Sequence, residues 1–437
     1  MPPILALTLC TIFVLFLLRL DRKQAPEVSF SLWIPTIWML HAASKPLGVW
    51  FRYGANVEGS ILDRIFLSSL LCLCLFMLVR RKYDWSIDMK EHIWLFLLIG
   101  YMLVSILWSD IPFISFKRWI REIIAVVMAF LVLSEPDPRQ AIQSIFRRTI
   151  YIMIPFSLLL IKYYPEYGVD FGRWSGVRMW IGVTTQKNGL GRLCIIAAFF
   201  LIWSLVKRRR GHDISVTKYQ TYAEVLVLFI TLWLLKGPPG AYSATAIGAF
   251  AMGLSAFVYL LWKKRHRINL GATPFVAMLA LGIAFGIATV FLSGSTLEPV
   301  TDVLGRDATL TGRTDIWLRL LPVAMERSIV GHGFGGFWTN TTREVYHISE
   351  GHSGYLDVIL DLGFFGLMLF SMFLLSSCRK AQKELDHDFY WGSLWICYLL
   401  MAVVHNITES SLNTFTSQIM AVLLFLAVSS TASTSST

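Results

Sequence analysis

Two polar side chains, Arg313 and His352, stand near the ends of the longest polar interval in an otherwise strongly apolar chain. The planar guanidinium of arginine presents a fixed fork of donors that suits a phosphate group. A neutral imidazole accepts a proton from an attacking hydroxyl, and an imidazolium binds an anion. The two side chains are therefore candidates for binding an anionic substrate and for acid–base chemistry on it. The alternatives are a local ion pair of Arg313 with Asp315 or Asp307, and a purely structural histidine at the membrane interface.

Carboxylates follow His352 along the chain. Asp357 and Asp361 are four residues apart, which places them on one face of a helix. A carboxylate at the centre of a membrane helix costs about 2.5–3.5 kcal/mol, so we expect both to face the bundle interior with partners. For Asp361 we favour a structural role as the partner of arginines on the outer side. His405 and Glu409 are also four apart, and a structural pair or a polar wall of the site explains them equally well.

Metal and nucleotide sites are not indicated by the sequence. No group of His, Asp, Glu and Cys has metal-ligand spacing and no phosphate-binding loop occurs, so we expect neither a metal nor another cofactor. His332 lies in GHGFGG, which has no strand before it, so a closely packed glycine turn is favoured over a dinucleotide fingerprint. The six cysteines lie in or beside apolar runs and are expected to pack.

The composition indicates a membrane protein. Of 437 residues 55% are hydrophobic and only 15% charged, which predicts an all-α polytopic membrane protein with about 12–13 transmembrane helices. The N-terminal run has its basic residues after it rather than before it, so it is read as a first span and not as a signal peptide. The expected spans are 3–20, 32–49, 61–79, 92–108, 120–133, 149–162, 189–206, 221–235, 243–262, 271–293, 353–377, 389–406 and 413–430.

Basic blocks between these runs set the expected orientation. If the spans alternate, all six blocks fall on one side, which the positive-inside rule makes cytoplasmic. The chain then divides into an N-terminal bundle, 1–293, an outer loop with short helices, 294–352, and C-terminal helices with a short cytoplasmic tail, 353–437. The net charge of +11 is thus a topology signal, and nucleic acid is excluded as a partner.

A second set of cations lies on the predicted outer side, against the orientation signal. Their retention there points to an anionic ligand at the outer membrane surface. Arg118 and Arg121 share one helical face because they are three residues apart. The set comprises Lys117, Arg118, Arg121, Lys162, Arg173, Arg178, Lys187, Arg306, Arg313 and Arg319.

Six motifs occur in a characteristic order: GVTTQKNGLG, YSAT, TGRTDIW, VGHGFGGFW, HSGYLDVILDLG and NITES. In this order they resemble the O-antigen ligase and Wzy-type polymerase superfamily, with the greatest likeness to exopolysaccharide polymerases of the ExoQ kind. The resemblance implies a C-type multispanning fold and metal-independent glycosyl transfer. The donor would be a glycan on undecaprenyl pyrophosphate, used at the periplasmic face of the bacterial inner membrane. Chain-length regulators and an export complex are the implied partners, besides membrane lipid.

The resemblance also implies roles for individual residues. Arg313 matches the arginine of the GRT motif and His352 the histidine proposed as catalytic base. Substrate-binding roles are expected for Arg173, Lys187, Asn188, Arg118, Arg121, Arg178, Asp357 and Glu409.

Two departures from the family pattern bear on the reaction. Gln186 stands where relatives carry His, and Ala244 where ligases carry Arg. Both favour polymerisation of lipid-linked repeat units over ligation of glycan to lipid A core or another acceptor. A transporter of lipid-linked sugars and a non-catalytic scaffold are further alternatives.

Overall fold

The computed structural model describes residues 1–53, 59–82, 90–172, 176–210, 218–269, 274–292 and 313–429. These residues are almost entirely helical, with one two-stranded hairpin. Apolar runs form helices because hydrocarbon offers no partner for a backbone N–H or C=O outside the segment. The all-α prediction is confirmed.

Seven of the described helices are long and apolar enough to cross a membrane, which makes this a multi-pass membrane protein. They are α1 (Pro3–Gln24), α4 (Ile61–Arg80), α8 (Pro138–Tyr163), α10 (Lys187–Arg209), α12 (Ala244–Arg265), α17 (Gly354–His387) and α18 (Phe389–Thr408). Three shorter apolar helices are α6 (Ile93–Ser105), α13 (Phe275–Phe291) and α19 (Gln418–Val428). Two further long helices are α7 (Pro112–Leu133) and α11 (Lys218–Lys236).

Each predicted span overlaps helix in the structure, but 32–49 is divided. It becomes a 3-10 turn, α2 (Trp33–Ala42) and α3 (Leu47–Trp50). Pro46 precedes α3, and proline disfavours helical backbone at the residue before it. The expectation of one continuous helix there was therefore wrong.

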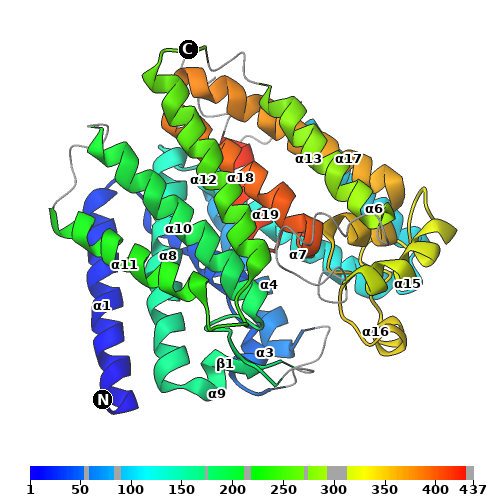
Figure 1. Ribbon diagram of the computed structural model, residues 1–437, viewed down its shortest axis with the longest axis horizontal. Coiled ribbons are helices and arrows are strands. Elements are labelled where there is room, and N and C mark those ends of the chain that lie inside the picture. Colours follow the sequence, from blue (N-terminus) through cyan, green and yellow to red (C-terminus); the bar gives the residue numbers. More distant parts are fainter. Residues whose placement is uncertain are drawn as a thin grey trace. The chain divides into compact units, whose positions relative to one another are not determined.

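The chain forms two compact units. The first unit comprises Met1–Tyr83, Val127–Val258 and Leu424–Thr437. In it α1 runs along α8 (Figure 1). The buried carboxylate of Asp21 accepts hydrogen bonds from Nε of Arg147 at 2.8 Å and Nε of Arg148 at 2.7 Å. Removing one partner would leave an uncompensated buried charge, so these bonds fix α1 on α8.

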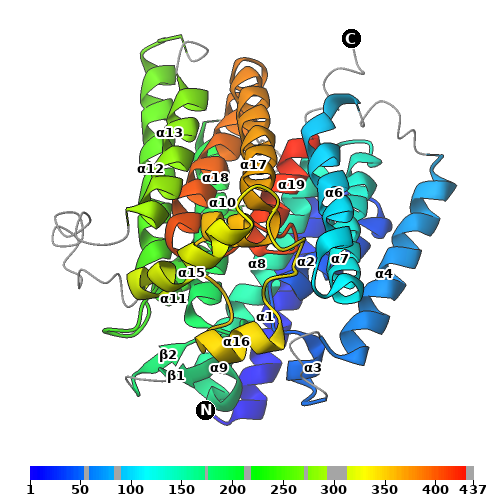
Figure 2. The same ribbon diagram turned by 90° about the vertical axis from the view of Figure 1, so that its right-hand side faces the viewer.

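The same unit carries a small hairpin after α8. The short helix α9 (Pro165–Gly168) leads into β1 (Val169–Phe171), which pairs antiparallel with β2 (Arg178–Trp180), Val169 opposite Trp180. Figure 2 shows the two strands beside α9.

The second unit comprises Asp84–Val126 and Tyr259–Leu423, and α17 is its central helix. It packs against α18, α13, α6 and α15 (Arg313–Glu326) (Figure 1). Gly363 interrupts the helical backbone of α17 with φ 66° and ψ −170°. A Cβ at that position would lie 2.3 Å from the backbone carbon of Ile329. Glycine therefore lets the loop before α17 approach this helix closely.

Candidate functional site

Arg313 is the first described residue of the predicted outer loop and begins α15. The side chains of Trp317, Leu320 and Ala324 recur at three- and four-residue spacing and are buried, which gives α15 one apolar face. Trp317 also donates from Nε1 to the carbonyl oxygen of Gly351 at 2.9 Å. The buried face of α15 therefore fixes the start of this helix against the turn that carries His352.

The guanidinium of Arg313 is engaged with a distant carboxylate. Its Nη2 donates to Oε1 of Glu409 at 2.5 Å, and the two side chains are only 11% and 2% exposed. The predicted alternative partner Asp307 lies outside the described residues. A buried ion pair contributes little net stability to a fold. The position of the Arg313–Glu409 pair beside His352 is therefore more informative about function than about stability.

His352 lies in the turn between α16 (Asn340–Tyr346) and α17. Its backbone is left-handed with φ 50°, which is uncommon for a residue other than glycine. Ser353 follows and caps α17 by accepting from the Leu356 amide. The Gly351 amide donates to Oδ1 of Asp357 at 3.0 Å. Bonds on both sides thus hold the His352 backbone in place.

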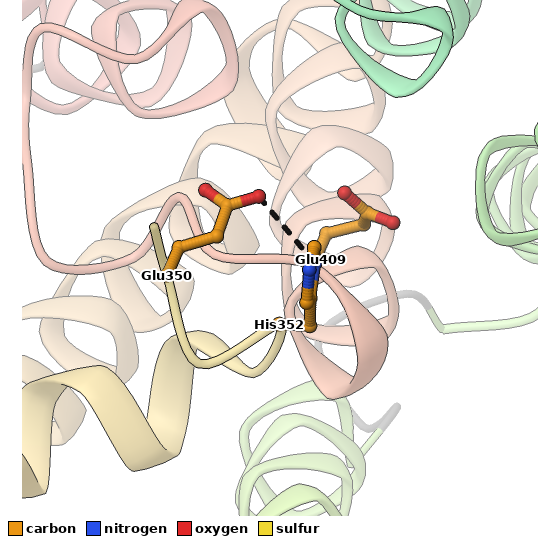
Figure 3. A group of neighbouring side chains, drawn as sticks. All are labelled: Glu350, His352 and Glu409. Atoms are coloured by element: carbon orange, nitrogen blue, oxygen red, sulfur yellow. Dashed lines mark ion pairs between the residues drawn. The ribbon is translucent and has the colours of Figure 1, made fainter. Parts of the chain in front are cut away.

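The surroundings of His352 lower its pKa and so favour the neutral imidazole. Burial lowers the pKa of His352, the positive charge of Arg313 lowers it further, and Asp357 acts in the opposite direction. Nδ1 is buried without a hydrogen-bond partner among the described residues. Oε1 of Glu350 lies 3.4 Å from that nitrogen, and Figure 3 shows the carboxylate turned toward the imidazole. A neutral ring at pH 7 is the form that accepts a proton.

Glu350, His352 and Glu409 form one cluster, with their ligand atoms within 4.8 Å of one another (Figure 3). Such a group could hold a metal ion, which the sequence spacing had not indicated because Glu409 comes from the distant turn after α18. Arg313 competes with any metal for the Glu409 carboxylate, since the two are already paired. The guanidinium of Arg313 is therefore the cation that lies closest to this carboxylate among the contacts described.

Asp357 and Asp361 are buried, as expected, and hold the loop before α17. Oδ1 of Asp357 accepts from Nε1 of Trp338 at 2.9 Å, in addition to the Gly351 amide. Oδ1 of Asp361 accepts from the Phe337 amide at 3.3 Å. These contacts make both carboxylates supports of the site.

The glycine-rich loop is the closely packed turn expected from its sequence. Gly331 has φ 67°, and a Cβ there would lie 2.5 Å from the backbone of Asp361. The adjacent His332 amide donates to the Leu360 carbonyl at 2.9 Å. Arg118 donates to the carbonyls of Gly335 and Trp338. Arg118 thus supports this loop with at least part of its donor set.

The remaining predicted substrate-binding residues have other locations. Arg121 is half-buried on α7, one residue from Glu122, whose carboxylate accepts from Thr414 and the Phe415 amide. In the first unit Lys187 and Asn188 begin α10 and Arg178 is exposed on β2, whereas Arg173 lies outside the described residues. A shared site of these four residues with Arg313 stays a prediction.

Glu350 is the member of the cluster that sequence reasoning missed. It is a half-buried acid in a segment rich in polar residues. The sequence did contain one indication of its role: Glu350 lies two residues before the candidate base His352, with a glycine between them.

The fold is that of a multi-pass, all-α membrane protein. Its candidate site combines an Arg–Glu ion pair with a histidine whose pKa is lowered, both next to helix ends. A model of the family described as O-Antigen ligase matches residues 225–371, which include Arg313 and His352. The chain is also similar to the exopolysaccharide production protein ExoQ of Rhizobium meliloti (strain 1021), with 22% identity over 307 residues. That alignment covers 68% of this chain and 66% of the relative. The resemblance predicted from the motifs is confirmed.

Proposed function

We propose that this protein polymerises oligosaccharide repeat units carried on undecaprenyl pyrophosphate into exopolysaccharide or O-antigen. The reaction is a glycosyl transfer at the periplasmic face of the bacterial inner membrane. The observation that carries the proposal is the buried ion pair of Arg313 and Glu409 beside a neutral His352. The similarity to an exopolysaccharide production protein supports it.

The reaction is a displacement at an anomeric carbon. The oxygen of an acceptor hydroxyl forms the new bond to that carbon, and pyrophosphate leaves with the electron pair of the old bond. The guanidinium of Arg313 binds the departing phosphate through its fork of donors, which requires it to exchange Glu409 for the phosphate. A preorganised cation in a site screened from water stabilises the charge that develops there.

His352 acts on the acceptor. Its neutral imidazole takes the proton of the attacking hydroxyl, and a single displacement inverts the anomeric configuration. The other outer-side cations, Arg118, Arg121, Arg173, Arg178 and Lys187, neutralise the remaining charge of the pyrophosphate together with Asn188. Phosphate clamping by cations makes the transfer metal-independent.

A ligase that transfers finished glycan to lipid A core or another acceptor is the second candidate. The description of the matching family as O-Antigen ligase favours it. Gln186 and Ala244, which depart from the ligase pattern, favour polymerisation. The two reactions differ in product, because a polymerase lengthens the lipid-linked chain and a ligase attaches it to a different molecule.

The test is reconstitution of the purified protein in liposomes with a purified lipid-linked repeat unit. A ladder of longer lipid-linked glycans supports the polymerase. Transfer only upon addition of an acceptor lipid identifies a ligase. No product under either condition contradicts both. A chain-length regulator, if one acts on this protein, would narrow the ladder without being needed for its formation.

A further inference from the structure

Glu350 presents a carboxylate to a ring nitrogen that lacks a hydrogen bond. Oε1 of Glu350 lies 3.4 Å from Nδ1 of His352 (Figure 3), and that nitrogen is buried without a partner among the described residues. Buried polar atoms are nearly always paired, because an unpaired one loses its bonds to water without replacement. We propose that Glu350 is a positioning residue that binds Nδ1–H of His352 and so keeps Nε2 as the base. The proposal rests on the glycosyl transfer proposed above.

The backbone between the two residues is fixed. Gly351 donates its amide to Asp357 at 3.0 Å and accepts from Nε1 of Trp317 at 2.9 Å. His352 itself is held at φ 50°. Only side-chain rotation of Glu350 is therefore needed to shorten the contact to a charge-assisted hydrogen bond of about 2.7–2.9 Å. Catalytic hydrogen bonds are often longer in the free protein than in the complex with substrate.

The neighbouring carboxylates have other partners. Glu409 accepts from Arg313 at 2.5 Å. Asp357 accepts from Trp338 and from the Gly351 amide. Glu350 is thus the carboxylate that pairs with His352, and its negative charge acts directly at Nδ1.

This contact selects the tautomer of the imidazole. A lone pair on Nδ1 would face a carboxylate and be repelled, whereas Nδ1–H is attracted, so the lone pair resides on Nε2. In the reaction the acceptor O–H bond breaks and an Nε2–H bond forms. The acceptor oxygen joins the anomeric carbon, and the bond from that carbon to pyrophosphate breaks. Glu350 stabilises the imidazolium until Nε2 returns its proton to solvent, as an orienting carboxylate does in other acid–base pairs.

The experiment compares Glu350→Gln with Glu344→Gln in the liposome elongation assay. Glu344 is an exposed acid on α16 and serves as the matched control. We expect Glu350→Gln to lower kcat by about 10- to 100-fold, the usual range for an orienting carboxylate, with KM for the lipid-linked donor unchanged. The acid limb of its kcat/KM profile should move to lower pH, because the charge that favours imidazolium is gone. Glu344→Gln should match the wild type in all three measurements.

Three outcomes would overturn the inference. They are an unchanged kcat, a lower kcat with an unmoved acid limb, and a raised KM at wild-type kcat, which would make Glu350 a donor-binding residue. Matching unfolding temperatures in detergent show that the variants are folded. Suppose that the wild type elongates glycan and His352→Ala does not. A Glu350→Gln variant with wild-type kinetics then refutes the role of Glu350 and leaves the proposed function standing. If the wild type makes no product, the proposed function itself fails.

Discussion

Arg313, His352 and Glu409 are balanced in charge before any substrate arrives. One guanidinium and one carboxylate are paired in a largely buried place, and the adjacent imidazole is neutral. In the proposed reaction, a pyrophosphate that displaces Glu409 from Arg313 compensates the charge of the guanidinium and frees a carboxylate next to His352. Binding of the proposed donor would thereby change the electrostatics at His352.

The first prediction concerns pH. Burial and Arg313 lower the pKa of His352, so its basic form persists below the ordinary value of about 6.5. We expect kcat/KM to stay constant as pH falls to that value and to decline only at lower pH, where the imidazole becomes protonated. Initial rates of elongation from pH 4.5 to 8 would measure this, with recovery at pH 7.5 as the control for inactivation. An acid limb above 7 would contradict the environment described for His352.

The second prediction concerns metals. Because Arg313 already occupies the Glu409 carboxylate and supplies the positive charge, removal of divalent ions should leave the elongation rate unchanged. The measurement is elongation after dialysis against excess EDTA, followed by addition of Mg²⁺ or Mn²⁺. Activity that disappears with EDTA and returns with either ion would show that Glu350, His352 and Glu409 hold a metal instead.

Among the elements, α15 and α17 place the two main side chains of the site. Arg313 begins one helix, His352 immediately precedes the cap of the other, and Trp317 joins the two by its bond to Gly351. The loop between α15 and α17 reaches the interrupted backbone at Gly363, where it packs closely. The position of His352 therefore depends on this close packing.

The third prediction tests that packing through Gly363→Ala. The backbone at Gly363, φ 66° and ψ −170°, is almost restricted to glycine, so the substitution should cost about 1–3 kcal/mol in strain alone. The added Cβ would also meet Ile329, which increases the loss. We expect a lower unfolding temperature in detergent than for the wild type. Gly100→Ala in α6, where a Cβ meets nothing within 4 Å, is the control, and equal stability of the two variants would refute the packing.

The sequence predicted helices better than contacts. Apolar runs place the spans because a membrane allows little else, and the three- and four-residue spacing of Trp317, Leu320 and Ala324 is that of the buried face of α15. The pairing of Arg313 with Glu409 could not be predicted, since the two are 96 residues apart and no periodicity connects them. The role of Asp357 as a clamp on Gly351 depends on loop geometry that local patterns do not encode.

At the scale of the whole molecule, the proposed reaction depends on the membrane orientation that the basic blocks predict. The proposed donor is lipid-linked because the predicted outer side has no nucleotide sugars. The similarity covers about two thirds of each protein, so it supports the polysaccharide role without testing the sidedness.

The fourth prediction tests the sidedness directly. In a variant whose six native cysteines are replaced, a cysteine at Val345, an exposed residue of α16, should react with a membrane-impermeant maleimide from outside the inner membrane. A cysteine at Arg209, exposed in a basic block, should react only after permeabilisation. The reverse labelling pattern would place the cluster in the cytoplasm and exclude a periplasmic reaction.

The central claim is that Arg313 binds the leaving pyrophosphate during chain elongation. Its most direct test is the rate of ladder formation in liposomes for the wild type, Arg313→Ala and Arg327→Ala, the last removing an exposed arginine directly after the same helix. We predict a loss of about 100- to 1,000-fold for Arg313→Ala, as for removal of one group that stabilises transition-state charge, and a wild-type rate for Arg327→Ala. A folded Arg313→Ala protein that elongates glycan at the wild-type rate would contradict the claim.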